Sequence, residues 1–233
     1  MPSVLILLSA ATTLRLTDGS TRSVGFWPEE LTEPHREFTH AGLDITLATP
    51  GGAPAVPDPA GFTPEGTGAP ADRCDELRHA VERLQPHLKA PEPLENLTAG
   101  RFDAVFLPGG YAPMIDLYGE PACGTLLTDF HRAGKPMAAV CHAPAALLSC
   151  ASPDGHWPFA GYRMTAFTDA EEEDLGLLRT LPWTAERALT QRGAHFLAGP
   201  QAWGEHIVHD RQLLTGQNPA SAAPLARRLV ALL

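Results

Sequence analysis

Lysine, basic charge and long hydrophobic runs are scarce in this chain of 233 residues. Only Lys89 and Lys135 are lysines, and the formal net charge is −10, so the basic face that a nucleic-acid backbone demands is not expected. The apolar run at residues 4–8 is far too short to span a bilayer, and no positively charged segment precedes it as in a signal peptide. We therefore expect a cytoplasmic protein without a nucleic-acid or membrane partner.

Disulfide and metal-binding patterns are missing too. Four cysteines in a chain of this length do not indicate a disulfide framework, and no pair has the CxxC spacing of a zinc or redox site. The ten histidines show neither HxH nor HExxH spacing. We expect reduced thiols and no metal site.

The hydrophobic pattern predicts alternating strands and helices. The expected strands lie at residues 4–9, 43–48, 104–107, 137–140, 206–208 and 213–215. The expected helices lie at 34–41, 72–88, 120–133, 144–150, 183–191 and from 220 onward, with a surface excursion rich in proline and glycine at 51–70. This order indicates an α/β fold of the flavodoxin-like, doubly wound type, with a mostly parallel sheet, helices on both faces and a single domain over residues 1–233.

One junction between a strand and a helix stands out. The strand at 137–140 runs directly into Cys141, His142 and a helix start, which is the layout of a nucleophile elbow. Such a turn raises the side chain above the carboxyl ends of the strands, and the positive end of the following helix is expected to lower the pKa of the Cys141 thiol. A buried structural thiol is the alternative for any lone cysteine, and the other three cysteines lack this context.

A second motif follows the strand at 104–107. Paired glycines after Pro108 let backbone N–H groups approach a ligand closely, as an oxyanion hole requires. Gly109 and Gly110 are therefore candidate oxyanion donors, together with Ala143 after the elbow.

The two motifs, at residues 107–110 and 139–144, resemble those of the DJ-1/PfpI superfamily, which is related to class I glutamine amidotransferases. Segments 25–34, 165–172 and 214–221 are similar to its heat-shock-protein-31-like, glyoxalase III branch. The resemblance runs from the first strand to the last helix. It implies a homodimer, in addition to the fold expected above.

The resemblance also assigns roles to acidic residues. Glu30 corresponds to a carboxyl group that sits against the nucleophile's sulfur, protonated and able to act as general acid or base, with Glu29 as the adjacent contender. The acid that orients His142 corresponds to Glu172, with Glu171 as the second choice. Without the resemblance, the run at 171–173 would be interpreted as a solvated helix start.

Two aromatic residues and some departures from the family pattern concern the pocket. Trp27 and Tyr111 lie next to Glu30 and Gly110 in the sequence and are expected to line it, whereas other tryptophans are expected to be core or loop anchors. Ala143 and Ala166 stand where the family usually has glycine, and Ala143 narrows the space beside the sulfur. The polar stretch at 10–24 lies in a position to shape the pocket mouth.

The activity that this resemblance implies is the glyoxalase III reaction: cofactor-independent conversion of methylglyoxal, or a related 2-oxoaldehyde, to a 2-hydroxy acid by a cysteine nucleophile. This would be a glutathione-independent lyase. A cysteine-dependent hydratase or hydrolase acting on a larger biosynthetic intermediate is the first alternative. The second is a stress-related holdase chaperone with Cys141 as a redox sensor.

Overall fold

The central element of the computed structural model, which describes residues 1–152 and 154–233, is a seven-stranded sheet. Its strands lie in the order β10-β11-β7-β6-β1-β4-β5, and all neighbours are parallel except β10 and β11. The strands are β1 (Ser3–Leu7), β4 (Asp44–Thr49), β5 (Glu92–Pro93), β6 (Ala104–Leu107), β7 (Met137–Val140), β10 (Ile207–Asp210) and β11 (Leu213–Gly216). The predicted α/β fold with a mostly parallel sheet is confirmed.

Alternate residues of the inner strands enter two separate hydrophobic cores. In β1, Leu5 and Leu7 belong to one core, whereas Val4 and Ile6 belong to the other. The residues of β6 and β7 divide in the same way. Because both faces of the sheet are buried, these strands read as continuous apolar runs and not as alternating ones.

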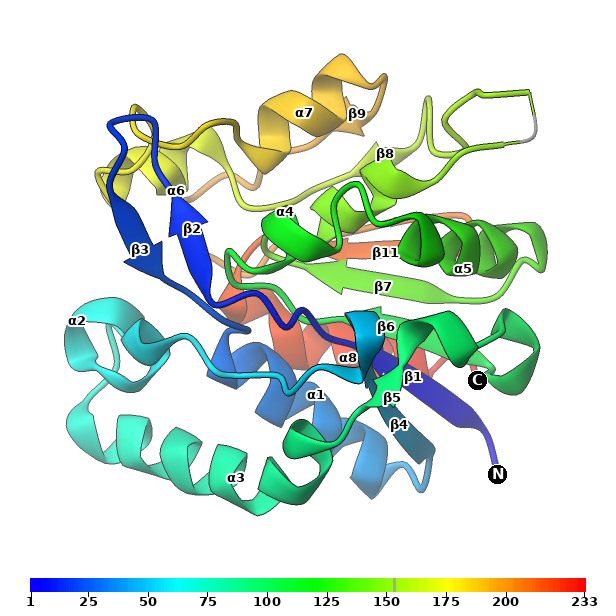
Figure 1. Cartoon of the computed structure of the whole chain (residues 1–233), viewed down its shortest axis with the longest axis horizontal. Coiled ribbons are helices and arrows are strands. Elements are labelled where there is room, and N and C mark those ends of the chain that lie inside the picture. The colour runs from blue at the N-terminus through cyan, green and yellow to red at the C-terminus, as the bar shows by residue number, and fades with distance from the viewer. Residues whose placement is uncertain (153) are drawn as a thin grey trace.

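Helices cover both faces of this sheet. One core receives side chains from α5 (Pro121–Arg132), the 3-10 helix η5 (Ala143–Ser149) and α7 (Ala185–Gln191). The other receives them from α1 (Pro28–His40), α3 (Ala71–Lys89) and α8 (Ala222–Val230). Figure 1 accordingly shows α5 in front of the sheet and α8 behind it. In the described ranges, no helix combines the length and hydrophobicity needed to cross a membrane.

Several short strands and helices lie outside the main sheet and its long helices. Two short pairs of strands lie outside the main sheet: β2 (Thr13–Arg15) with β3 (Thr21–Ser23), and β8 (Arg163–Met164) with β9 (His195–Phe196). The short helices are η1 (Pro50–Gly52), η2 (Pro59–Phe62), α2 (Pro64–Thr67), η3 (Leu94–Asn96), η4 (Ala99–Arg101), α4 (Pro113–Asp116), α6 (Asp169–Asp174) and η6 (Pro219–Ser221). Most of these were missed from the sequence because two- to six-residue elements carry too little periodicity.

Two predictions about helices next to the site were wrong. Helix α1 begins at Pro28, not at Pro34, because a proline is well suited to the first helical position and Pro34 is accommodated inside the helix. Glu30 therefore lies in the first turn of a helix. After Cys141 the chain forms a 3-10 helix of seven residues, where an ordinary helix was expected. The tighter 3-10 turns run from Ala143 to Ser149 and are buried along most of their length.

Candidate active site

Cys141 occupies a strained turn at the carboxyl end of β7. Its φ angle is 61°, in the left-handed region that residues other than glycine rarely adopt. The Cys141 N–H donates to the Gly216 carbonyl at 2.9 Å, and the Phe167 N–H donates to the Cys141 carbonyl at 2.9 Å. Backbone hydrogen bonds to two separate segments thus hold the strained turn in place. The cysteine is only 4% exposed.

A chain of buried hydrogen bonds starts at this sulfur. The Cys141 Sγ lies 3.1 Å from Nδ1 of His142, and Nε2 of His142 lies 2.8 Å from Oε1 of Glu172. An ionised carboxylate can only accept, so Glu172 places the imidazole proton on Nε2 and leaves Nδ1 free to accept the thiol proton. This is the relationship between nucleophile, base and orienting acid that is found in catalytic triads.

Tyr111 adds one more residue to this series of hydrogen bonds. Its hydroxyl donates to Oε2 of Glu172 at 2.5 Å, and its ring centre lies 4.3 Å from that of His142. Burial raises the pKa of the Tyr111 hydroxyl, so the group remains a hydrogen-bond donor. Phe167 stacks on the same imidazole at 4.5 Å, with 27° between the ring planes. The imidazole is therefore fixed by packing as well as by hydrogen bonds.

Glu171, the second choice for the acid, faces a different set of partners. Consecutive residues of a helix point about 100° apart, so only one of the two neighbours can reach the imidazole. Oε1 of Glu171 accepts from the Trp203 N–H at 2.9 Å and from the side-chain amides of Gln217 and Asn218 at 3.0 and 2.8 Å. Glu172 is thus the acid beside His142, and Glu171 ties together loops around the site.

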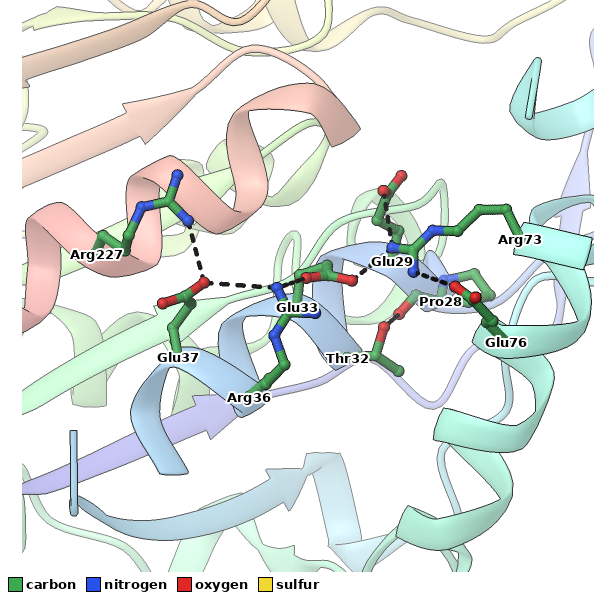
Figure 2. A network of polar contacts seen from close by, with 9 residues as sticks. All are labelled: Pro28, Glu29, Thr32, Glu33, Arg36, Glu37, Arg73, Glu76 and Arg227. Atoms are coloured by element: carbon green, nitrogen blue, oxygen red, sulfur yellow. Dashed lines mark hydrogen bonds and ion pairs between the residues drawn. The ribbon is translucent and has the colours of Figure 1, made fainter. Parts of the chain in front are cut away.

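Glu30 approaches the cysteine from α1. It is fully buried, its Oε2 accepts the Gly109 N–H at 2.7 Å, and its Oε1 has no hydrogen-bond partner among the described residues. Burial raises the pKa of Glu30 to about 8, against the opposing effects of the Gly109 N–H and the neighbouring Cys141 thiol. At neutral pH the carboxyl group is therefore largely protonated. Glu29, the adjacent contender, instead lies 3.5 Å from Arg73 of α3 (Figure 2).

The pKa of the Cys141 thiol differs from the sequence expectation. Burial raises it well above the ordinary cysteine value, a charge on Glu30 raises it further, and the Gly110 N–H lowers it. The expected lowering by the following helix was wrong because removal of the sulfur from water outweighs the backbone N–H groups. Formation of the thiolate therefore depends on transfer of the proton to His142.

The two glycines after β6 have different tasks. A Cβ at Gly109 would lie 2.6 Å from the Val140 carbonyl oxygen, and one at Gly110 would lie 2.4 Å from the Gly25 carbonyl oxygen, so no side chain fits at either position. The Gly109 N–H is bound to Glu30 and is not free for an oxyanion. Gly110 lines the cavity beside Cys141, whereas Gly109 and Ala143 do not. Of the three expected oxyanion donors, Gly110 is thus the one that lines the cavity beside Cys141.

The cavity above the sulfur is small, with a volume of about 60 Å³. Its lining residues are Arg22, Trp27, Ala60, Gly66, Gly110, Tyr111, Cys141, His142, Phe167, Leu175, Trp203 and Pro219. Trp27 and Tyr111 were expected there, and Arg22 belongs to the stretch at 10–24 that was expected to shape the pocket mouth. Phe167 and Trp203 were not expected. The loop bearing Trp203 reaches the site through its bond to Glu171, and no local sequence pattern signals such a contact.

The model of one protein family, described as the DJ-1/PfpI family, matches residues 24–232. This chain belongs to that family. A bovine relative named glutamine amidotransferase-like class 1 domain-containing protein 1 is 34% identical over 60% of this chain, and the chain covers 64% of that relative's length. The protein/nucleic acid deglycase HchA of Pseudomonas aeruginosa is 26% identical over 91% of this chain and 74% of its own length.

Solved structures of this DJ-1/PfpI fold are similar over the whole chain. Glyoxalase III from Candida albicans superimposes with a TM-score of 0.83 at 23% identity, covering 99% of this chain and 96% of its own. The Rapid Encystment Protein 24 kDa of Francisella tularensis gives a TM-score of 0.87 at 23% identity, covering 99% and 98%. The expected resemblance to the DJ-1/PfpI superfamily is confirmed by the family match, and these neighbours share its fold.

The other three cysteines do not line the cavity above Cys141. Cys74, Cys123 and Cys150 are buried free thiols, and burial raises the pKa of Cys123 and Cys150. Over residues 1–152 and 154–233, no three histidine, cysteine, aspartate or glutamate side chains are arranged to hold a metal ion.

Proposed function

We propose that this chain is a cysteine-dependent, cofactor-independent enzyme that converts methylglyoxal, or a related 2-oxoaldehyde, to the corresponding 2-hydroxy acid. The observation that carries the proposal is the buried chain from Cys141 through His142 and Glu172 to Tyr111, with protonated Glu30 beside the same sulfur. This arrangement offers a nucleophile (Cys141), a base (His142) and a second group that can carry a proton (Glu30), all within reach of a single substrate carbon atom bound to the sulfur. The name of the Candida albicans structure, glyoxalase III, agrees with this activity.

In the first step, the Cys141 proton passes to Nδ1 of His142 and the thiolate adds to the aldehyde carbon. The product is a hemithioacetal, in which a new C–S bond replaces the π bond of the aldehyde. The oxygen that gains charge lies near the Gly110 N–H, and Glu172 stabilises the imidazolium that forms.

The second step moves hydrogen between adjacent carbons. The alkoxide first takes a proton from the His142 imidazolium or from the Glu30 carboxyl group. The base that this leaves, neutral His142 or ionised Glu30, then removes the proton from the carbon bonded to sulfur, and an enediol forms. Return of a proton to the neighbouring carbon gives a 2-hydroxy thioester. Water then cleaves the C–S bond, releasing the hydroxy acid and restoring the thiol. The sum is addition of one water molecule, with no net oxidation.

The size of the cavity favours a short aldehyde. Pockets for drug-sized ligands usually measure about 300–1,000 Å³, whereas this one measures about 60 Å³. A hydratase or hydrolase acting on a larger biosynthetic intermediate would require Trp27, Phe167 or Trp203 to move.

The test is incubation with methylglyoxal, without glutathione or added metal, beside a Cys141→Ala control. We expect the wild type alone to form lactate, with a turnover of about 1 s⁻¹ or more. No lactate, while Cys141 is still readily alkylated at neutral pH, would exclude the glyoxalase reaction and leave a nucleophile for another substrate. Equal lactate formation by both proteins would exclude the thiol mechanism.

A further inference from the structure

Arg22 comes from the β2–β3 hairpin and lies at the active-site cavity. It stands directly opposite Leu14 in the hairpin, so the two side chains share a face. Leu14 is 4% exposed and packs in the same hydrophobic cluster as Tyr111. The guanidinium carbon of Arg22 lies 5.7 Å from the centre of the Tyr111 ring, and Arg22 lines the cavity together with Cys141 and His142.

The hairpin is fixed in this position by backbone contacts. The Val24 N–H donates to the Thr12 carbonyl at 3.0 Å, and the Thr17 N–H donates to the Thr180 carbonyl at 2.8 Å. Figure 1 shows the hairpin beside α6, the helix that carries Glu172. The first of these contacts closes the hairpin ladder, and the second, together with the Thr17 hydroxyl that donates to the same Thr180 carbonyl at 3.1 Å, attaches the hairpin to the segment after α6.

The charge of Arg22 has no direct counterion in the described part of the chain. No carboxylate there lies within 4.0 Å of its guanidinium, and the side chain makes no hydrogen bond. Its charge opposes part of the rise that burial causes in the pKa of Asp58, whose Oδ1 accepts from the Ala60 N–H. By contrast, Arg73, Arg101, Arg187 and Arg227 each pair with an acid. The five N–H donors of Arg22 are therefore available.

The rest of the cavity wall leaves the Arg22 guanidinium as the main partner for an anionic group. Trp27, Phe167, Leu175 and Trp203 contribute mainly apolar surface, and the indole N–H of Trp203 is already bound to Asp174. Glu172 is already bound to His142 and Tyr111, and Glu30 is largely protonated at neutral pH. An anionic group that enters the mouth therefore has one strong partner, the guanidinium.

We infer that Arg22 binds a carboxylate on the substrate, and that the preferred substrates are 2-oxoaldehydes whose far end carries this group. The inference rests on the proposed function for the reaction, which is unchanged: water is added and the product is a 2-hydroxy acid with a second carboxylate. An arginine fork matches the two carboxylate oxygens, so the contact is specific as well as attractive.

Turnover of matched aldehydes tests the inference. The probes are 4,5-dioxopentanoate and its uncharged isostere 5-methyl-2-oxohexanal, with methylglyoxal as the reference. We expect the wild type to prefer the carboxylate probe, and Arg22→Met to lower its kcat/KM about 10- to 100-fold, mainly through KM, with the uncharged probes changed less than about threefold. Arg22→Lys should restore part of the loss.

Arg15→Met is the matched control. Arg15 is exposed on the opposite face of the same hairpin, so this variant removes an equal charge without touching the cavity. It should behave like the wild type with all probes. A uniform loss across the three aldehydes in Arg22→Met, or no preference for the carboxylate probe in the wild type, would overturn the inference.

Alkylation of Cys141 separates this inference from the proposed function, because it requires no turnover. Iodoacetate and iodoacetamide have nearly the same shape, but only iodoacetate is anionic. We expect the rate constant for iodoacetate divided by that for iodoacetamide, both at Cys141, to fall about tenfold or more in Arg22→Met. In Arg15→Met this ratio should be unchanged. An unchanged ratio in Arg22→Met excludes carboxylate binding. A reduced ratio in a protein that makes no lactate would retain the anion site and reject the glyoxalase reaction.

Discussion

Two hollows lie beside α1, and they differ in how their polar groups are satisfied. A groove between α1 and α3 measures about 580 Å³ and is lined by arginine, histidine and glutamate side chains. There Arg73 pairs with Glu33 at 2.5 Å and with Glu76 at 3.0 Å, and Arg36 also contacts Glu33. Figure 2 shows this network continuing through Glu37 to α8.

The cavity above Cys141 is about a tenth as large, at about 60 Å³ against 580 Å³, and its polar groups are less satisfied. Glu30 has a buried oxygen without a partner, and Arg22 has no carboxylate within ion-pair distance among the described residues. Arg36, Arg73, Glu33 and Glu76 in the groove pair with one another, whereas Glu30 and Arg22 at the cavity retain unused bonding capacity. Unused bonding capacity in a protected place, more than volume, identifies the reactive site.

The largest effect that would sharpen this contrast is expected at Glu172. Glu172→Gln keeps the shape of the side chain but removes the charge that stabilises the protonated His142. We expect kcat for methylglyoxal to fall about 100-fold or more, as measured by lactate formation across the pH range.

Glu171→Gln is the control for that variant. It disturbs the bonds to Trp203, Gln217 and Asn218 but does not touch His142. We expect the free energy of unfolding in urea to fall by about 2 kcal/mol, with kcat within about tenfold of the wild type. Equal losses of activity in both variants would mean that Glu172 acts through stability alone.

The next effect concerns stability and pH at Glu30. Its pKa of about 8 in the folded protein exceeds the ordinary value of 4.5, so the folded state holds a proton that the unfolded chain has released. The stability that this proton gives is complete below pH 4.5 and is lost as the pH rises through 8. Relative to Glu30→Gln, which does not titrate, the wild type should lose up to about 1.4 kcal/mol per pH unit in this window. Urea unfolding at pH 5, 6, 7 and 8 measures the difference; a constant difference would mean that Glu30 is charged when folded.

The smallest effect is expected in the groove. Arg73→Met removes the pairs with Glu29, Glu33 and Glu76, but the Arg73 side chain is 32% exposed. We expect a loss of about 1 kcal/mol in the free energy of unfolding, smaller at high salt, and less than a threefold change in kcat/KM. Arg227→Met, which removes the pair with Glu37 on the same helix, is the matched control. A tenfold loss of activity in Arg73→Met alone would break the contrast and link the groove to Glu30.

Sequence reasoning located the strands that bear the site more accurately than the helices. Strands β6 and β7 have the predicted boundaries. Each is a short apolar run that ends at a clear turn, the prolines and glycines after β6 and Cys141 after β7, so its limits can be predicted closely. The start of α1 was misplaced because Pro28 and Pro34 are both compatible with a first turn, and only packing against α3 and α8 distinguishes them. The 3-10 form of η5 is likewise a matter of packing.

The site residues likewise divide into those that could be predicted from the sequence and those that could not. Cys141, His142 and Gly110 were found from local motifs, and Glu30 and Glu172 from the family resemblance. Their catalytic roles remain predictions that the variants above test. Arg22 lies in the stretch at 10–24 that was expected to shape the pocket mouth, but no local pattern distinguished it from its neighbours. Phe167 and Trp203 come from loops far apart in the chain, and their sequence neighbourhoods contain no pattern that predicts a common cavity.

By itself, the sequence determined the α/β alternation, the turn at Cys141 and the glycines that this turn requires, because these depend on local backbone preference and hydrophobic period. Only the tertiary structure decided which of two adjacent acids meets His142, how far burial raises the pKa of Cys141 and Glu30, and that Arg22 is the residue of the stretch at 10–24 that lies at the cavity. Those properties depend on distances between segments and on exclusion of water, and neither is encoded in the local order of residues.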